Sequence, residues 1–461
     1  RCGVPQAPPS PAGLPSGGLW GRIFRDFRQC RARSRRRPPL RGGDVTLAAM
    51  HDTAFYREVL EITHPWRVDK VELHKDAGEV HVHVQWRPDT RFACPECGKD
   101  CPGYDTQTRR WRHLDTCQYR TILVAEVPRA QCPEHGVKQV SVPRSERNSR
   151  FTALFEAQVV GWLKEEASIS AVSRRLGLDW STTASIMERA VERGIARRDS
   201  VAPTRIGVDE TSAKRGRNCV TVVRDVDRDV VLHVADGRGK EALASFYTSL
   251  PDEQREGIEH VVRDMHKPFI SATNEHLADA KEKICFDKFH IASHLGDAID
   301  KVRREENREL QAMGDETLKG TRYAWLWNPA NTPAEKRHAF KPLSDSALRT
   351  ARAWAIREEA MMLWHYVSPT WAAKAWQKWL GWTRRCRLEP VKKVGRMVKN
   401  HLYGVMNAVV SGFTNAGSEA MNTKIQHVKR IARGFRNPKR FRMAILFHCG
   451  GLDLYPDGTH A

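Results

Sequence analysis

Two short copies of one pattern, Cys-Pro-Glu-X-Gly, carry the clearest metal-binding chemistry in the sequence. They are CPECG at 94–98 and CPEHG at 132–136. Zinc takes four sulfur or nitrogen ligands in a tetrahedron, and a tight loop that ends in glycine can present two of them together. Since four protein ligands leave no position open for a substrate, we expect a structural zinc ion. The predicted ligands are Cys94, Cys97, Cys132 and His135.

Alternatives remain open for this part of the sequence. The four residues could belong to a small metal-free core with reduced thiols, or one of three nearby donors could replace a ligand. Upstream, His81 and His83 alternate along a strand-like segment; they could bind a metal, but we expect them to lie on a solvated strand face. The three spare donors are Cys101, His113 and Cys117.

A second set of residues with metal-binding chemistry is acidic. Asp209 ends the apolar segment 206–208, and Glu210 beside it is a rival ligand. Asp264 ends the apolar segment 260–263. Each aspartate alone could equally cap a turn. Because basic residues follow the first acid at once, the pattern indicates carboxylates that hold divalent cations, which in turn hold the phosphates of a nucleic acid.

The segments around these acids predict an α/β fold with a ribonuclease-H-like mixed sheet. Three strand-like runs follow one another from residue 204, and helical segments then alternate with two short strands that end near 264 and 287. A mixed sheet flanked by helices fits this order. In that layout, the acid on the first strand lies beside the acid that follows the fourth strand, and a later helix supplies a third carboxylate.

Residues 149–200 predict helices, of which the last two follow a helix-turn-helix plan. A short helix ends at Gly177, Leu178 fills the turn, and a second helix begins near Ser181. Small hydroxyl side chains at the start of that helix would face base edges or phosphates of DNA. An ordinary helical hairpin is the alternative. The expected DNA contacts are Ser181, Thr182 and Thr183.

The composition favours a polyanionic partner. The 461 residues include 76 Lys and Arg against 55 Asp and Glu, a formal net charge of +21, which favours nucleic acid over a membrane surface. No apolar run approaches the roughly 18 residues that span a bilayer, and no secretory signal is evident. Since the 11 cysteines are odd in number and unevenly spread, we expect a reducing compartment and a cytoplasmic, nucleoid-associated protein.

The sequence resembles the ISL-three family of bacterial insertion-sequence transposases, which combine an N-terminal zinc module with an Asp-Asp-Glu active site. The resemblance covers about residues 55–450, in order. It rests on the two zinc loops with RRWRHLD, and on GVDE, VVRDMHKPFI, CFDKFHIASHLGDAIDKVRR and TNAGSEAMNTKIQHVKRIARGFRNPKRFR.

The resemblance implies that Glu419, in the last of these motifs, is the third acid, although a glutamate at a helix start is also favoured by the helix dipole. Two divalent ions, Mg²⁺ or Mn²⁺, would then be held, with Asp209 bridging both. Asp264 and Glu419 would each hold one ion. Asp287 and His290 resemble a D-x-x-H element of related transposases, and we expect them to support the metal ligands without binding the ions.

A basic segment follows Glu419 on the same predicted helix. Between 424 and 442 it carries eight Lys and Arg. A solvated helix face is the alternative, but we expect several of these side chains to contact phosphates near the metals and to position DNA without reading its sequence. The expected contacts are Lys424, Lys429, Arg430, Arg433, Arg436, Lys439 and Arg440.

These assignments divide the chain into eight segments. Residues 1–49, rich in Pro, Gly and Arg, are predicted to be disordered, and translation from upstream of a natural start at Met50 would explain them. A basic DNA-binding arm is the alternative. The other segments are a β-hairpin at 50–92, a zinc module at 93–148, a helix-turn-helix at 149–200, the catalytic core at 201–300 and 406–450, a helical insertion at 301–405 and a tail at 451–461.

The helical insertion is rich in tryptophan and holds eight of the 14 in the chain. Trp376, Trp379 and Trp382 recur every three residues, which places them on one side of a helix. We expect them to pack in a core. Stacking on an exposed base at a DNA end is the alternative.

Together these features predict a DNA transposase. The zinc module and the helix-turn-helix would bind terminal inverted repeats, and the core would cleave double-stranded DNA and join it to a target. We expect a homo-oligomer, a dimer or larger, on DNA, and no membrane partner. The alternatives are a transposase-derived regulator without catalysis, which has no need to keep three acids, and a structure-specific nuclease.

Overall fold

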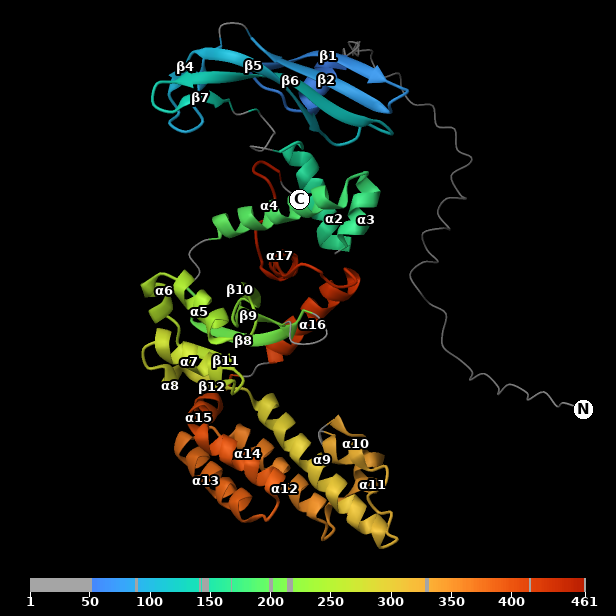
Figure 1. The fold of residues 1–461 in the computed structure, drawn as a ribbon, viewed down its shortest axis with the longest axis vertical. Helices are drawn as coiled ribbons and strands as arrows, with labels where there is room; N and C mark the ends of the chain where they lie inside the picture. The colour runs from blue at the N-terminus through green and yellow to red at the C-terminus, as the bar shows by residue number, and fades with distance from the viewer. Residues whose placement is uncertain are drawn as a thin grey trace, which may run out of the picture.

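The computed structural model shows four bodies that follow one another along the chain (Figure 1). They are an N-terminal sheet, a helix-turn-helix, a mixed sheet with its helices, and a helical bundle. The predicted disorder of residues 1–49 lies outside the described part of the chain. The structure describes residues 52–87, 90–140, 142, 149–166, 168–198, 202–213, 219–327, 331–413 and 416–459.

The N-terminal body is a single sheet preceded by helix α1 (Asp52–Val59). Its strands are β1 (Trp66–His74), β2 (Glu79–Trp86), β5 (Gly103–Arg112), β6 (Arg120–Cys132) and β7 (Gly136–Gln139), and a small ladder joins β3 (Phe92–Ala93) to β4 (Asp100–Cys101). The strand order is β1-β2-β6-β5, with β7 paired to β6. β1 and β2 form the predicted hairpin. Because β2 also pairs in parallel with β6, the segments predicted at 50–92 and 93–148 share one sheet.

The helix-turn-helix forms for local reasons that the sequence makes visible. Its helices are α2 (Ala153–Glu166), α3 (Ile169–Leu176) and α4 (Trp180–Arg197). Ser168 caps α3 by accepting a hydrogen bond from the N–H of Ala171 at 3.4 Å. Gly177 ends α3 with a φ of 62°, in the left-handed region that favours glycine. The predicted turn at Gly177 is therefore confirmed.

The mixed sheet that the sequence predicts follows. Its strands are β8 (Arg205–Ser212), β9 (Cys219–Asp225), β10 (Val230–Asp236), β11 (His260–Arg263) and β12 (Ile284–Phe286), in the order β10-β9-β8-β11-β12. The first three strands are antiparallel, whereas β11 pairs in parallel with both β8 and β12. This is the ribonuclease-H-like layout.

Helices cover both faces of this sheet. Apolar side chains of α5 (Lys240–Ser249) and α7 (Lys267–His276) pack on one face, where Ile206 and Val208 point. The other face is covered by α16 (Ala416–Ile431) and α17 (Pro438–Cys449). The short helices α6 (Asp252–Glu256) and α8 (Ala280–Lys283) connect the strands. The chain therefore leaves the sheet after β12 and returns to it with α16.

These intervening residues form a helical bundle with its own core, which begins before and ends after the helical insertion predicted at 301–405. Its elements are α9 (Lys288–Ala312), α10 (Arg322–Leu326), α11 (Ala334–Ser344), α12 (Arg349–Met362), the 3-10 helix η3 (Leu363–His365), α13 (Pro369–Arg385), α14 (Glu389–Asn400) and α15 (Leu402–Ser411). Trp376 and Trp379 are buried in this core, and the indole of Trp379 donates to the carbonyl of Ile356 at 2.8 Å. Their predicted packing role is confirmed, and Trp382 is partly buried against the same core.

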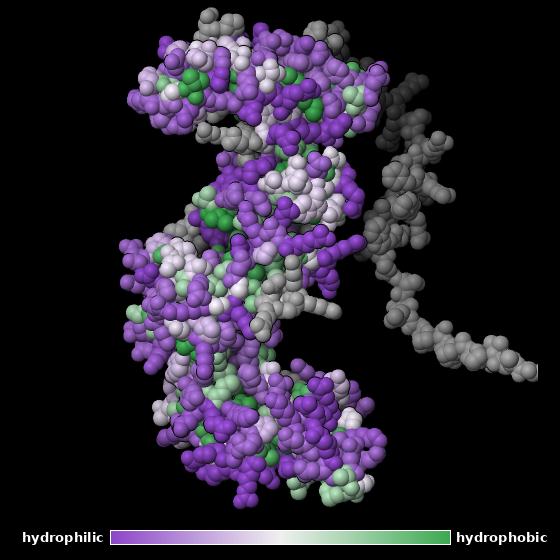
Figure 2. All heavy atoms as spheres, viewed as in Figure 1, coloured by the Kyte–Doolittle hydropathy of each residue, from purple (hydrophilic) through white to green (hydrophobic). Residues whose placement is uncertain are grey.

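The visible surface is predominantly hydrophilic over all four bodies (Figure 2). Among the described helices, none combines the length and the apolar character that a membrane crossing requires.

Candidate active site and DNA-binding modules

Three aspartates lie side by side on the three parallel strands of the mixed sheet. Val262 of β11 pairs with Gly207 of β8, so Asp264, two residues after Val262, is level with Asp209, two residues after Gly207. In the same way, β11 and β12 pair in step through Arg263 and Phe286, and the next residue on each strand is an aspartate, Asp264 and Asp287. The register therefore brings together Asp209, Asp264 and Asp287.

The pKa values of this group reflect its crowding. Burial raises the pKa of Asp209, and the negative charges of Asp264 and Asp287 raise it further, although the hydrogen bond from the N–H of Glu210 and the charge of His290 oppose them. Burial and the charge of Asp264 also raise the pKa of Glu210. The mutual repulsion of these carboxylates suits a site for divalent metal ions.

Helix α16 lies against strand β8 and contacts the first acid directly. Asn422 donates its Nδ2–H to Oδ2 of Asp209 at 2.8 Å. One turn later, Gln426 donates to Oγ1 of Thr211 at 2.7 Å. Thr211 lies two residues after Asp209, so both side chains point to the same face of β8. Residues four apart on α16 therefore meet residues two apart on β8. Asn422 is a site residue that the sequence prediction missed.

Glu419 lies one turn before Asn422 on this helix. Residues three apart are neighbours on a helix surface, so Glu419 lies next to the side chain that binds Asp209. Its neighbour Ser418 is buried and accepts a hydrogen bond from Nε of Arg224 at 2.9 Å, which fixes the start of α16 on the sheet. Glu419 itself is exposed. Its role as the third acid remains a prediction.

The start of α16 approaches the sheet closely because two glycines allow it. A Cβ added to Gly207 would lie 3.2 Å from Oγ of Ser418, and one added to Gly417 would lie 2.5 Å from Nη2 of Arg224. The buried Arg224 also pairs with Asp229 at 3.3 Å, so it cannot simply move aside. Within the sequence GSE at 417–419, Gly417 is therefore needed for the packing of α16 on the sheet, whereas Glu419 is the predicted third acid.

Asp287 and His290 lie at the same end of the sheet. Asp287 is 2 % exposed and caps α9 by accepting the N–H of Phe289 at 3.1 Å. Nε2 of His290 lies 3.9 Å from Oδ2 of Asp287. Because the charge of His290 also lowers the pKa of Asp209 and of Glu210, the imidazole faces the acidic group. The predicted supporting role of this pair remains a prediction.

Glu210, the rival ligand, lies on the opposite strand face from Asp209. Its Oε1 lies 3.6 Å from Nδ1 of His266, and its Oε2 lies 4.0 Å from Nη1 of Arg238. Successive residues of a strand point to opposite faces, so Asp209 faces α16 whereas Glu210 does not. The geometry favours Asp209 as the ligand on β8.

The crowded acids lead to a stability prediction. A carboxyl whose folded-state pKa is raised stabilises the fold below its unfolded pKa and loses that contribution as pH rises through the folded pKa. We therefore expect Asp209→Asn to raise the melting temperature of the metal-free protein at pH 7.5, by about 2–4 °C for about 1 kcal/mol. The gain should shrink at pH 5. Thermal unfolding with a chelator tests this, with exposed Asp76→Asn as the control; no gain, or one that grows at low pH, contradicts it.

The four predicted zinc ligands converge. The ligand atoms of Cys94, Cys97, Cys132 and His135 all lie within 4.8 Å of one another. Sγ of Cys132 lies 3.5 Å from Nδ1 of His135, close to the ligand separation in a zinc tetrahedron with bonds of about 2.0–2.3 Å. Burial raises the pKa of Cys132, but hydrogen bonds from the N–H of Glu134 and from His135 outweigh it and lower the pKa to about 6. The site thus favours a thiolate.

The three spare donors, Cys101, His113 and Cys117, lie outside the four-ligand cluster. His113 is buried and shares a hydrogen bond with Oγ1 of Thr152 at 2.9 Å, and Cys101 donates to the carbonyl of Lys99 at 3.2 Å. Cys117 is exposed. Nε2 of His83 lies 2.9 Å from Glu72 and Nε2 of His81 lies 2.8 Å from Glu79, and the ligand atoms of Glu72, His81 and His83 lie within 4.8 Å of one another. Cys101 also interacts with Cys132, but the convergence of the four predicted ligands supports the predicted zinc site.

The start of α4 offers fewer DNA contacts than predicted. Ser181 is exposed and Thr182 is half-buried. Thr183, however, is fully buried, and its hydroxyl accepts a hydrogen bond from Ser173 at 2.9 Å. We therefore assign Thr183 to the packing of α3 on α4 and keep Ser181 and Thr182 as predicted contacts.

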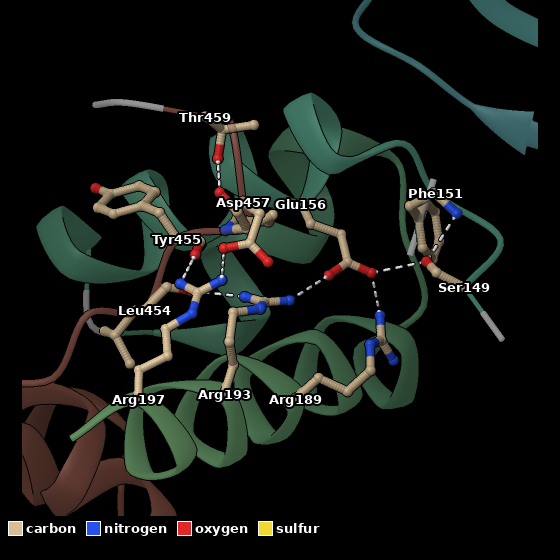
Figure 3. Close-up of polar contacts among 11 residues, drawn as sticks. Ser149, Phe151, Glu156, Arg189, Arg193, Arg197, Leu454, Tyr455, Asp457 and Thr459 are labelled. Atoms are coloured by element: carbon tan, nitrogen blue, oxygen red, sulfur yellow. Dashed lines mark hydrogen bonds and ion pairs between the residues drawn. The ribbon is translucent and has the colours of Figure 1, made fainter. Parts of the chain in front are cut away.

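A row of arginines on α4 ties the helix-turn-helix to α2 and to the C-terminal tail (Figure 3). Arg189 and Arg193 both pair with Glu156 of α2, which is 0 % exposed. Arg193 donates to the carbonyl of Leu454 at 2.7 Å, and Arg197 donates to that of Tyr455 at 2.5 Å. Within the segment predicted as a tail, Leu454 and Tyr455 thus bind α4 of the helix-turn-helix.

We expect Glu156→Gln to lower the free energy of unfolding strongly, because Glu156 pairs α2 with two arginines of α4. Removing one charge from a buried ion pair typically costs about 3–5 kcal/mol, because the partner charge is left uncompensated. The exposed pair Lys319–Glu316 at 2.7 Å provides the control, since exposed pairs contribute about 0–1 kcal/mol. Chemical denaturation of Glu156→Gln and Glu316→Gln should separate the two; equal free energies of unfolding would contradict this assignment.

The predicted phosphate contacts are spread around α16, the following loop and α17. Lys424 pairs with Asp229 at 3.0 Å, and Lys429 donates to the carbonyl of Ser212 at 2.7 Å. Arg430 lies 3.0 Å from His427, and Lys439 lies 3.8 Å from Glu188. Arg433 and Arg436 are exposed in the loop, and Arg440 stacks over Trp180. Lys439 and Arg440 therefore face α4 of the helix-turn-helix, whereas Lys424 and Lys429 lie against the mixed sheet.

Comparisons with known proteins match this organisation module by module. Residues 90–135 match the zinc-finger of transposase IS204/IS1001/IS1096/IS1165, and residues 140–191 match the helix-turn-helix domain of transposase family ISL3. Residues 206–445, more than half of the chain, match the ISL3-type DDE domain described as "Transposase". These matches confirm the predicted zinc module, helix-turn-helix and DDE domain, in that order.

Curated relatives agree over nearly the whole chain. The transposase for insertion sequence element IS1557 of Mycobacterium tuberculosis is 29% identical over 442 residues, which cover 89% of this chain and 98% of the relative. The transposase for IS1001 of Bordetella parapertussis is 25% identical over 402 residues, covering 84% of this chain and 97% of the relative. The chain therefore belongs to the ISL3 family of DDE transposases.

Proposed function

We propose that the protein binds the terminal inverted repeats of an insertion sequence and catalyses metal-dependent cleavage and strand transfer of the bound DNA. The observation that carries this proposal is the alignment of Asp209 with Asp264 across parallel strands, with the helix that bears Glu419 packed on the same sheet face as Asp209. Carboxylates on three separate elements, in a basic chain, suit divalent cations that hold phosphate.

The proposed metal ligands are Asp209, Asp264 and Glu419, with two Mg²⁺ or Mn²⁺ ions. Asp209 would help to hold both ions; its Oδ1 accepts the N–H of Glu210 and its Oδ2 accepts the side-chain N–H of Asn422. When bound, the ions activate the attacking oxygen and stabilise the leaving oxygen of a phosphodiester. Asn422 restrains one carboxylate oxygen of Asp209, and the Asp287–His290 pair supports the row from β12 and α9.

The zinc module and the helix-turn-helix would bind the ends. Ser181 and Thr182 lie at the start of α4, where Arg440 stacks over Trp180 and Lys439 lies 3.8 Å from Glu188. Contacts of this kind to phosphates fix the position of the duplex, so they would set the scissile bond at the acids. We further propose that the protein acts on DNA as a homo-oligomer, because two ends must be joined to one target.

An assay with end DNA tests this function against its rivals. The substrate is a duplex that carries the inverted repeat flanking the gene, with scrambled and branched duplexes as controls. We expect Mg²⁺-dependent nicking at the repeat and joined products with a target plasmid. Specific binding without cleavage would identify a regulator. Cleavage of branched DNA regardless of the repeat would identify a structure-specific nuclease.

A further inference from the structure

A cavity of about 680 Å³ opens between the helix-turn-helix and the last two helices of the core. One wall comes from the starts of α3 and α4, including Ile169 and Trp180. The opposite wall comes from the end of α16, the loop after it and the first turns of α17, including Phe435 and Ala444. The cavity thus joins the DNA-binding module to the catalytic domain.

The walls combine basic groups with apolar and aromatic surface. Among the described residues that line the cavity, no Asp or Glu occurs. Trp180 is 40% exposed, and the guanidinium of Arg440 lies 4.2 Å from the centre of its ring. Such a stack is favourable in itself and leaves one ring face for another planar group. The basic residues that line the cavity are Lys429, Arg433, Arg436 and Arg440.

The cavity is close to the acids along two independent paths. Lys429, which lines it, follows Asn422 by seven residues of α16, about 10 Å at the helical rise. Ala213, which also lines it, directly follows β8 and is four residues after Asp209, about 13 Å along an extended chain. A strand cleaved at the acids would therefore pass within a few nucleotides of the cavity.

We propose that this cavity holds an unpaired nucleotide of the DNA strand that is bound at the active site. Its base would stack on Trp180 between apolar walls, and its phosphates would contact the four basic residues. The volume lies in the range of pockets that enclose small organic ligands. This proposal rests on the proposed DNA-cleaving function, and it adds a ligand for a site outside the acids.

Duplex DNA alone would not contact both the basic and the apolar residues that line the cavity. Phosphates of a duplex could pair with the basic rim, but paired bases are already stacked on their neighbours, so Trp180 and the apolar wall would stay uncovered. A single unpaired base presents a free face for stacking, and aromatic platforms accept any base. The site therefore favours a frayed or extruded nucleotide without strong sequence preference.

Fluorescence anisotropy with two labelled duplexes tests the proposal. One is blunt, and the other carries an overhang of three thymidines on one strand. We expect the full-length protein to bind the overhang duplex about tenfold more tightly, because stacking on one aromatic side chain is of this order per base. Trp180→Ala should abolish the preference, whereas Trp180→Phe should retain most of it.

The chain offers a matched control for this change. Trp371 of α13 is 62% exposed and also carries a cation, Nζ of Lys374 at 4.9 Å, but it lies on the helical bundle. Trp371→Ala should keep the preference. Ala432→Trp, which adds a large side chain to the cavity wall just after α16, should remove it. Equal binding of both duplexes by the wild type, or a preference that survives both Trp180→Ala and Ala432→Trp, would overturn the proposal.

The proposals for the cavity and for the catalytic site can be rejected independently of each other. Asp209→Ala removes a proposed metal ligand but no lining residue, so it should keep the overhang preference while it loses cleavage. A wild-type protein that shows the preference but never cleaves would leave the cavity assignment standing and reject the proposed catalysis. Cleavage without the preference would do the reverse.

Discussion

Asp209→Ala and Asp264→Ala are each expected to lower the rate of strand cleavage by about 10³-fold or more, with little change in the affinity for transposon ends. Removing a single group that stabilises charge in a transition state typically costs about 10²–10³-fold, and these acids would hold the ions that do this. Glu419→Ala should behave in the same way. Cleavage of a labelled end duplex, with end binding measured in parallel, provides the readout.

Neighbouring residues supply controls for the acid variants. Glu210 is the closest rival, and it lies on the opposite strand face; Glu210→Gln should retain much more cleavage than Asp209→Asn. Asn422→Ala should reduce the rate by a smaller factor, because it removes only a restraint on Asp209. Retained cleavage in any of the three acid variants would remove that acid from the site.

Cys132→Ser should abolish zinc binding at the N-terminal module and, with it, specific binding to transposon ends. Structural zinc sites contribute about 10–16 kcal/mol of binding free energy that is coupled to folding, far more than the small sheet can supply without it. End binding should then fall to the non-specific level, typically about 10³-fold weaker or more. Zinc content by mass spectrometry and gel shifts with end and scrambled DNA measure the two effects.

The matched control for the zinc prediction is Cys117→Ser. Cys117 is exposed and lies outside the four-ligand cluster, so this variant should keep one zinc ion per chain and normal end binding. If Cys132→Ser also kept a full equivalent of zinc, the ligand set would be wrong. If it lost zinc but kept end binding, the zinc module would not be needed for DNA recognition.

Features with a short-range signal could be predicted from the sequence. The zinc ligands come from two loops in which a cysteine is followed three residues later by a second ligand and then by glycine, and Gly177 marks the turn of the helix-turn-helix. The pairing of Asp209 with Asp264 could also be expected, because parallel strands of a ribonuclease-H-like sheet end at one edge. In each case, local backbone chemistry or a standard topology fixes the geometry.

Features that depend on long-range packing could not be predicted in this way. Asn422 meets Asp209 across 213 positions of sequence, and only the arrangement of α16 on β8 brings them together. A signal was present, since Ser418, Asn422 and Gln426 are polar residues four apart on a helix. Thr183 was misjudged because a helix start does not reveal which side packs on its neighbour.

The central claim is that three separated acids surround one pair of divalent ions, and iron-directed cleavage of the protein tests it most directly. Fe²⁺ bound in place of Mg²⁺ generates hydroxyl radicals with ascorbate and cuts the backbone at its ligands. In the DNA-bound protein, we predict cuts near 209, 264 and 419 that excess Mg²⁺ suppresses together. Cuts near 209 and 264 without one near 419 would contradict the proposed site.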